Sequence, residues 1–170
     1  MPFLDEVEAA IPALRRYAHA LLRDRSAADD LVQDCLERAL SRRILWRRQG
    51  DVKPWLFRIL LNLCRDEHRR RAARPVLVPI DSVSEAGGSG GQEEFMNLRE
   101  VHRAMGQLPE DQRAALLLVS LEGMSLGEAA QVLGIPDGTL ASRLARARAA
   151  LRRTTCRAPD RPDDVRGHRP

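Results

Sequence analysis

A segment rich in glycine, proline and acidic residues, over positions 75–97, most limits what this chain can fold into. It contains two prolines and the glycine-rich run 87–91, and its four acidic side chains have no basic residue among them. Such a segment packs poorly into a core and bends freely. The stretches 1–74 and 98–156 are each long enough for one small domain. We therefore predict two small domains joined by a flexible acidic linker, with a disordered tail over 157–170.

The composition and the spacing of apolar residues predict that both domains are all-α. Only six of the 170 residues are aromatic, which argues against a β-sandwich or a barrel. Leucine, alanine and arginine dominate instead, and these residues favour helices. In the first half, Ser26 and Asp29 have the spacing of a capping box, and Pro54 stands where a helix would begin. In the second half, apolar residues recur at helical spacing from Leu98 to Leu151.

Several classes of protein are excluded because their usual motifs are absent from the sequence. The three cysteines lie far apart, without a Cys-x-x-Cys motif or a histidine at ligand spacing, so we expect neither a disulfide framework nor a metal site. The sequence contains no catalytic constellation and no phosphate-binding loop, so we expect no enzyme activity and no cofactor. It has no apolar run of membrane-spanning length and no signal peptide, which predicts a cytoplasmic protein without membrane insertion.

The segment 125–151 has the pattern of a helix-turn-helix. Ser125 and Glu128 have the spacing of a capping box at the start of a short helix, and Gly134 stands where that helix would end. Pro136 then stands near the start of a longer helix, so that a short turn joins the two. This arrangement is typical of DNA-binding proteins.

The longer helix of this pattern would present three polar side chains on one face. Thr139, Arg143 and Arg146 fall within about 60° of each other on a helical wheel. Hydroxyl and guanidinium groups on such a face can contact phosphates and guanine edges in a major groove. The alternative is a helical hairpin with a solvated arginine face.

A basic face is predicted on the helix that runs from Pro54 to about Arg71. One amide and three guanidinium groups share it: Arg58, Asn62, Arg65 and Arg69. These groups suit base-edge reading flanked by phosphate contacts. Three further residues lie nearby in the sequence, where an aromatic side chain could stack on an unpaired base: Trp46, Lys53 and Trp55. The alternatives are a solvated basic face for the arginines and a place in the core for Trp55.

An acidic stripe is predicted on the helix that follows Ser26. Its members fall within about 100° on a helical wheel and face away from the apolar side: Asp30, Gln33, Asp34 and Glu37. Because an acidic surface would repel nucleic acid, this stripe should face a basic protein partner. Ordinary solvation of a helix face is the alternative.

Taken together, these residues resemble a known protein family. The stretch Ala28–Asp34, followed by Trp55–Arg69, resembles region 2 of the bacterial extracytoplasmic-function (ECF) sigma factors. The stretches Leu108–Arg113 and Gly123–Arg148 resemble region 4 of the same proteins. The resemblance covers nearly the whole chain outside the linker and the tail, and the two motifs in this order are highly specific.

The resemblance implies a dissociable subunit of RNA polymerase that recognises promoter DNA. Region 2 would open and read the −10 element, and region 4 would read the −35 element. The acidic stripe, with Asp30, Gln33 and Asp34, would meet the clamp helices of the polymerase β′ subunit. The helix over 55–70 would lie on the −10 DNA, and the loop over 46–53 would capture a base flipped out of the stack.

For region 4, the resemblance places four residues in or beside the −35 major groove: Thr139, Ser142, Arg143 and Arg146. The helix Ala114–Leu121 would help to hold the tip of the polymerase β flap, and the acidic linker would follow the RNA exit path. Since the tail is too short for another domain, a separate partner, an anti-sigma factor, is the expected regulator.

The chain departs from the family pattern at two places. The segment Arg42–Arg48 is much more basic than in typical members, so a base preference does not carry over, and Leu40 stands where the family often has tryptophan. Two other functions stay open. A sigma-like decoy would bind an anti-sigma factor without directing transcription. A simple helix-turn-helix regulator would leave the acidic stripe and the helix over 55–70 without a role.

Overall fold

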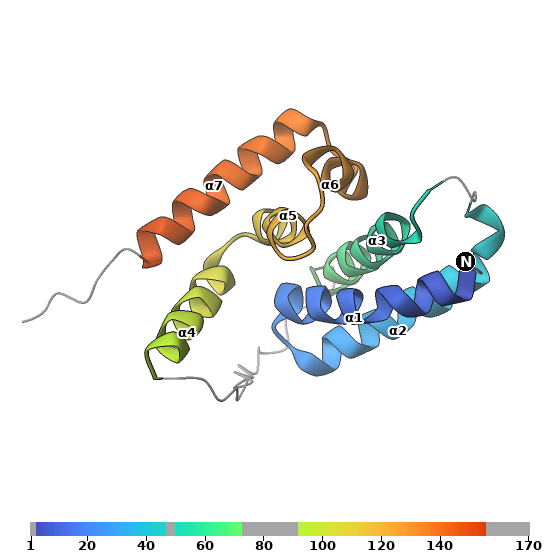
Figure 1. The fold of residues 1–170 in the computed structure, drawn as a ribbon, viewed down its shortest axis with the longest axis horizontal. Helices are drawn as coiled ribbons and strands as arrows, with labels where there is room; N and C mark the ends of the chain where they lie inside the picture. The colour runs from blue at the N-terminus through green and yellow to red at the C-terminus, as the bar shows by residue number, and fades with distance from the viewer. Residues whose placement is uncertain (1–2, 47–49, 73–91, 156–170) are drawn as a thin grey trace, which may run out of the picture.

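The computed structural model describes residues 3–46, 50–72 and 92–155 of the chain. Within these ranges it is helical and contains no strand, which confirms the all-α prediction (Figure 1). The α-helices of the described residues are α1 (Phe3–Leu22), α2 (Arg25–Ser41), α3 (Val52–Ala72), α4 (Gln92–Gln107), α5 (Glu110–Ser120), α6 (Leu126–Leu133) and α7 (Asp137–Thr155). A short 3-10 helix, η1 (Arg43–Leu45), follows α2. No helix in these described ranges is long and apolar enough to cross a membrane.

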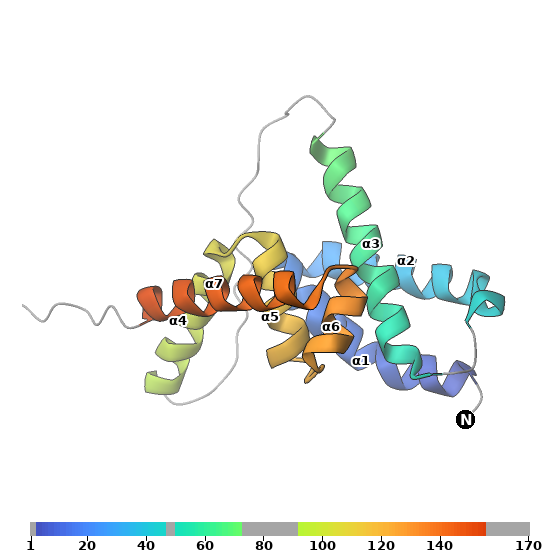
Figure 2. The same ribbon diagram turned by 90° about the horizontal axis from the view of Figure 1, so that it is seen from above.

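The first half of the chain folds as a three-helix unit. α1 and α2 lie side by side, and α3 packs across both (Figure 1, Figure 2). Their apolar faces meet in a core that includes the fully buried side chains of Leu14, Leu21 and Leu60. The rings of Tyr17 and Phe57 meet edge to face at its centre, with centroids 5.1 Å apart. Burying a side chain of this size contributes about 1.5–3 kcal/mol, so this core holds the three helices together.

The turn between α1 and α2 differs from the prediction made from the sequence. Arg23 adopts the left-handed conformation, with φ 61°, and ends α1. Asp24 follows in an extended conformation and accepts a hydrogen bond from the Ala27 amide at 3.0 Å, so Asp24 is the N-cap of α2. The predicted capping box of Ser26 and Asp29 is therefore wrong. A short carboxylate caps as well as serine does, and the turn at Arg23 brings Asp24 to the helix start first.

The second half contains the predicted helix-turn-helix, formed by α6 and α7. The Ser125 amide donates to Glu128 Oε2 at 2.8 Å, and the Glu128 amide donates to Ser125 Oγ at 3.3 Å, which confirms the capping box. Gly134 ends α6 with φ 67°, a conformation that favours glycine. The helix α7 packs against α4, α5 and α6, and the buried side chains of Leu140 and Leu144 lie on its inner face.

One element boundary differs from the predicted domain division. The predicted linker reaches residue 97, whereas α4 begins at Gln92. The residues from Gln92 onward are compatible with a helix, and only the glycine-rich run before them opposes one. The rest of the predicted linker and the predicted tail lie outside the described residues.

The two predicted domains are in direct contact. α5 lies against α1, and α6 lies against α3, so that buried side chains of both halves form one continuous apolar core (Figure 2). Across this contact the Tyr17 hydroxyl donates to the Ala114 carbonyl oxygen at 3.1 Å. Burial raises the pKa of the Tyr17 phenol, which therefore stays a hydrogen-bond donor.

Candidate polymerase and DNA interface

The predicted acidic stripe lies on α2 and is open to solvent. All four of its members are exposed: Asp30, Gln33, Asp34 and Glu37. The opposite side of the helix is buried at Leu31 and Cys35, which fixes the acidic side outward. Gln33 Nε2 donates to Glu37 Oε1 at 3.1 Å, one helical turn along. The structure thus brings the predicted residues together on one exposed face, which we call the acidic face.

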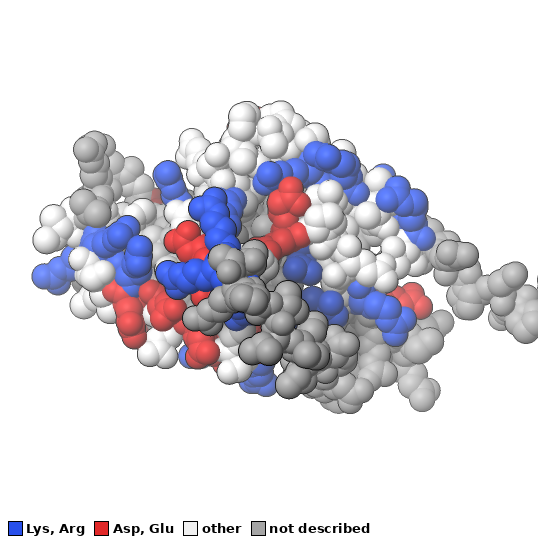
Figure 3. Space-filling model, turned by 180° about the vertical axis from the view of Figure 1, so that it is seen from behind, with Lys and Arg blue, Asp and Glu red and all other residues white. Residues whose placement is uncertain are grey.

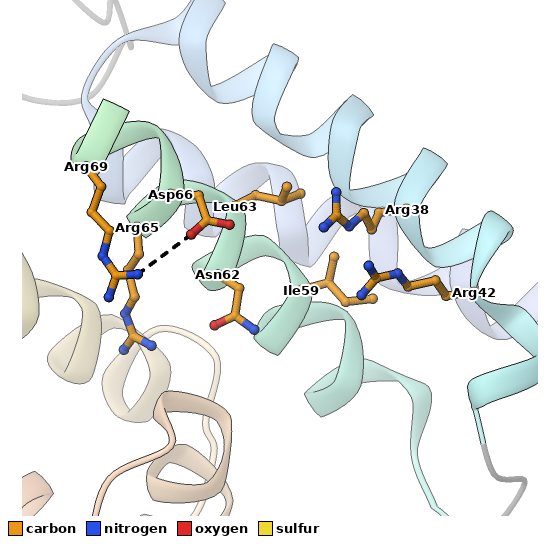
Figure 4. A pocket seen from close by; sticks show the side chains of 8 residues that line it. All are labelled: Arg38, Arg42, Ile59, Asn62, Leu63, Arg65, Asp66 and Arg69. Atoms are coloured by element: carbon orange, nitrogen blue, oxygen red, sulfur yellow. Dashed lines mark ion pairs between the residues drawn. The ribbon is translucent and has the colours of Figure 1, made fainter. Parts of the chain in front are cut away.

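A basic hollow lies between α2 and α3 and has a volume of about 310 Å³ (Figure 4). Four arginines, one asparagine and one aspartate line it, together with two apolar side chains: Arg38, Arg42, Ile59, Asn62, Leu63, Arg65, Asp66 and Arg69. Asp66 is the one acid among these lining residues, and its carboxylate lies 4.0 Å from Arg69. A surface with this excess of guanidinium groups suits the phosphates of a nucleic acid.

Two arginines of the basic hollow were not among the residues predicted from the sequence. Arg38 and Arg42 lie one helical turn apart near the end of α2, on the side that faces α3 (Figure 4). Their spacing already indicates a shared helix face. That this face meets Asn62 of α3 depends on how the two helices pack, which the sequence alone does not reveal.

The two tryptophans of the predicted −10 set lie in an aromatic cluster. The Phe3 ring lies 5.3 Å from the Trp46 ring and 6.1 Å from the Trp55 ring, measured between centroids. Both indoles are half-buried and pack against the core. Trp55 thus packs against the core, which agrees with the alternative to base stacking given for it above, and Trp46 packs there as well. Arg58, in contrast, is exposed on α3.

Lys53 and Arg65 of the predicted −10 set contact the second half of the chain. The Glu122 side chain is 0% exposed and lies 3.2 Å from Lys53 Nζ and 3.0 Å from Arg16 Nη2. Arg65 Nη2 donates to the Leu133 carbonyl oxygen at 3.2 Å. A buried carboxylate needs such partners, because an unpaired one would be strongly destabilising. The packing of the two halves therefore occupies two cations that were predicted to bind DNA.

The predicted −35 residues share the outer side of α7. Ser142 and Arg146 are exposed, and Arg146 Nη2 donates to Ser142 Oγ at 3.3 Å. Arg143 is partly covered, and its Nε lies 3.2 Å from Asp111 Oδ2 on α5. Thr139 is also partly exposed. The four residues thus lie on one face, and one of the two arginines is held by a carboxylate.

On the face that Figure 3 shows, lysine and arginine side chains lie in several groups with acidic side chains between them, rather than in one large basic area. The chain as a whole has a net charge of +4. Because non-specific affinity for DNA grows with the number of phosphates neutralised, we expect the isolated chain to bind DNA only modestly.

Cys64 and His68 on α3 lie close to Glu110 on α5. Cys64 Sγ donates to Glu110 Oε1 at 3.5 Å, and His68 Nδ1 lies 2.5 Å from Glu110 Oε2. Burial and the nearby Glu110 carboxylate raise the pKa of the Cys64 thiol to about 12. Cys64 and His68 are one helical turn apart, which corrects the expectation that no histidine lies at ligand spacing from a cysteine.

Comparisons with known proteins match both halves of the chain. The model of the sigma2 domain of PhyR matches residues 7–61, and that of Sigma-70 region 4 matches residues 98–151. The chain is 37% identical over 147 residues to the ECF RNA polymerase sigma factor EcfG of Rhodopseudomonas palustris. This alignment covers 86% of this chain and 81% of that protein. It is 38% identical over 140 residues to the ECF sigma factor SigM of Mycobacterium tuberculosis, covering 82% and 70% of the two chains.

A solved structure has the same arrangement of helices. The sigma factor RpoE of Bartonella quintana, in complex with the anti-sigma factor NepR, matches with a TM-score of 0.75 and 30% identity, over 89% of this chain and 95% of that one. The sequence and structure matches extend over both halves of the chain and agree with the motifs of regions 2 and 4. The chain therefore belongs to the ECF sigma factors of bacterial RNA polymerase.

Proposed function

We propose that this sigma factor directs RNA polymerase core to promoters through three separate surfaces: the acidic face of α2, the basic hollow, and the outer side of α7. As an ECF sigma factor the chain is an alternative initiation subunit and not an enzyme. The observation that carries the proposal is the match to such factors over 86% of the chain, through both regions in order. Because transcription in bacteria takes place in the cytoplasm, the chain would act there.

The acidic face would bind the clamp helices of the β′ subunit. The carboxylates of Asp30, Asp34 and Glu37 are exposed together on α2 and carry three negative charges. A basic partner surface would be attracted to them, and complementary charge speeds encounter and fixes the orientation of the complex. Nucleic acid would be repelled from the same face, which separates the polymerase contact from the DNA contacts.

The basic hollow would lie on the −10 element. Arg38, Arg42 and Arg69 would contact phosphates, and the amide of Asn62 could read a base edge. The loop over 46–53 would hold a flipped base beside the aromatic cluster; its residues 47–49 lie outside the described ranges. Extracting a base costs a few kcal/mol, which stacking and phosphate contacts must offset.

The outer side of α7 would enter the −35 major groove. Ser142 and Arg146 are already exposed there, while Arg143 would have to leave Asp111 before it could reach a base or a phosphate. Exchanging one anionic partner for another keeps the guanidinium paired throughout. Asp111 would therefore compete with the DNA for the Arg143 guanidinium.

The packed arrangement of the two halves would have to open when the holoenzyme forms. Lys53 and Arg65 contact the second half, and the helix proposed for the β flap is buried from Ala114 to Leu118. RpoE of Bartonella quintana is bound to an anti-sigma factor in its solved structure. We propose that a partner of the same class binds this chain and keeps its polymerase surfaces covered.

Binding of the full chain to core polymerase tests the polymerase contact. Asp34→Arg reverses one charge at the centre of the acidic face and should weaken binding by at least about tenfold, because a basic partner would then meet a like charge. Glu8→Arg is the matched control, since it reverses an exposed charge on α1 outside this face. Circular dichroism should report intact helices for both variants. Equal affinities for the two variants would refute the assignment to the clamp helices.

A further inference from the structure

Three side chains of different chemistry meet where the two halves of the chain touch. Cys64 and His68 come from α3, and Glu110 comes from the first turn of α5. One ligand atom from each, a sulfur, a ring nitrogen and a carboxylate oxygen, lies within 4.8 Å of the other two. The initiation function described above uses none of these three residues.

The backbone positions of these residues are fixed by the fold. Cys64 and His68 are four residues apart, so they share one side of α3, the same spacing by which paired ligands on a helix hold a metal. Glu110 reaches this side because the second half packs on the first. The cluster therefore exists only while the two halves are in contact.

The donor set suits a tetrahedral zinc site with three protein ligands, and its ligand atoms lie close enough together for one ion to reach all three. Zn²⁺ bonds to sulfur at about 2.3 Å and to nitrogen or oxygen at about 2.0–2.2 Å, so its ligand atoms lie about 3.5 Å from each other. Here Cys64 Sγ lies 3.5 Å from Glu110 Oε1, and His68 Nδ1 lies 2.5 Å from the other carboxylate oxygen, Oε2. Metal binding would therefore require side-chain rotations that move the His68 nitrogen and the Glu110 oxygen apart. A thiolate and an imidazole disfavour Mg²⁺ and Ca²⁺, which prefer oxygen ligands.

Access and charge are also suitable for a metal ion. The Cys64 side chain is buried, whereas the His68 and Glu110 side chains are 49% and 29% exposed, so the cluster opens to solvent on one side. A water molecule can reach that side and supply the fourth ligand. The thiolate and the carboxylate together carry two negative charges, which would neutralise a divalent ion.

We propose that Cys64, His68 and Glu110 form a Zn²⁺ site that fastens the second half of the chain to the first. Binding replaces the thiol proton of Cys64 and the hydrogen bonds to Glu110 by three metal–ligand bonds, and the proton goes to solvent. Since the site is complete only in the packed arrangement, the ion stabilises that arrangement over one in which the halves separate.

Cobalt(II) provides a direct probe of this site in the full-length chain. Co²⁺ added to the reduced, metal-free protein should give one equivalent of tetrahedral absorption, with a thiolate-to-cobalt charge-transfer band, and Zn²⁺ should abolish it. Cys64→Ser should remove the charge-transfer band. Cys35→Ser and Cys156→Ser are the matched controls and should keep it, because Cys35 lies in the core away from the cluster.

A separate variant tests whether Glu110 links the two halves of the chain through the metal ion. Zn²⁺ should raise the melting temperature of the parent chain. Glu110→Gln should weaken Co²⁺ binding by at least about tenfold and should remove that rise. Glu110 is only partly buried, and circular dichroism checks that the variant folds. A band that survives Cys64→Ser would refute the site. Unchanged affinity in Glu110→Gln would refute the bridge between the halves. Neither readout depends on transcription, so they remain informative if the promoter surfaces are wrong.

Discussion

Replacing Glu122 by glutamine should loosen the contact between the two halves of this sigma factor. The Glu122 side chain is fully buried, and Arg16 Nη2 donates to both of its oxygens, at 3.0 Å and 3.1 Å. Lys53 Nζ lies 3.2 Å from Oε2. Glutamine keeps the shape of the side chain and one acceptor oxygen. It loses the negative charge, and its amide nitrogen would face a cation.

The free energy lost on Glu122→Gln can be estimated from the exposure of Glu122, Arg16 and Lys53. Breaking a buried ion pair by removing one partner costs about 3–5 kcal/mol when the other charge stays buried. Arg16 and Lys53 remain 52% and 31% exposed, so water can solvate both cations after the change. The smaller value for a hydrogen bond to a charged group, about 1.5–3 kcal/mol, therefore applies. We expect a loss of about 2 kcal/mol, which shifts the balance between packed and separated halves about 30-fold.

Urea unfolding and small-angle X-ray scattering measure the two consequences. The free energy of unfolding should fall, and the radius of gyration should rise as separated halves become more populated. A double-mutant cycle of Arg16→Gln with Glu122→Gln should give a coupling energy of about 1–2 kcal/mol. Glu100→Gln, an exposed change on α4, is the control and should leave both measurements unaltered. A coupling energy below about 0.3 kcal/mol would refute the ion pair between the halves.

Two further predictions concern the helix-turn-helix. Ser125→Ala removes the N-cap of α6 and should lower the free energy of unfolding in urea by about 1 kcal/mol. Hydrogen bonds from the side chain and amide of Ser125 hold the pKa of the Glu128 carboxyl below its usual 4.5. The stability that this carboxylate contributes is therefore complete above 4.5 and is lost as the pH falls through the lowered pKa. An NMR titration of Ser125→Ala should find the Glu128 pKa moved upward, and an unchanged pKa would contradict the capping box. Arg143→Ala should weaken −35 binding by the holoenzyme by about 1–3 kcal/mol, whereas Asp111→Asn, which frees the guanidinium, should leave it at least as strong. A DNase footprint that Arg143→Ala does not alter would place the reading surface elsewhere.

Features that depend on neighbouring residues could be predicted from the sequence. The capping box at Ser125 and the left-handed Gly134 are set by residues within one helical turn, so the helix-turn-helix follows from local chemistry. At the start of α2, local chemistry leaves two candidates, because Ser26 and Asp24 both suit a cap. The choice between them is made by the left-handed turn at Arg23, for which the sequence gives no signal.

Features that depend on packing could not be predicted. Glu122 meets Arg16 across 106 positions of the chain, and nothing local marks it as a buried carboxylate. Likewise, the Arg38 and Asn62 side chains line one hollow only because α2 packs on α3. The sequence correctly placed the acidic stripe on one exposed side of a helix, since its pattern repeats at helical spacing. It did not reveal which basic residues the second half would cover.

Run-off transcription measures directly whether this chain directs core polymerase to promoters. Core polymerase would be mixed with the full chain, with Asp34→Arg or with no addition, on a library of genomic promoter fragments. We expect defined new start sites that require the chain and are lost with Asp34→Arg, and their shared sequences would identify the −10 and −35 elements. An absence of new start sites, with tight binding of the chain to an anti-sigma protein, would refute promoter-directed initiation by this chain and favour a sigma-like decoy.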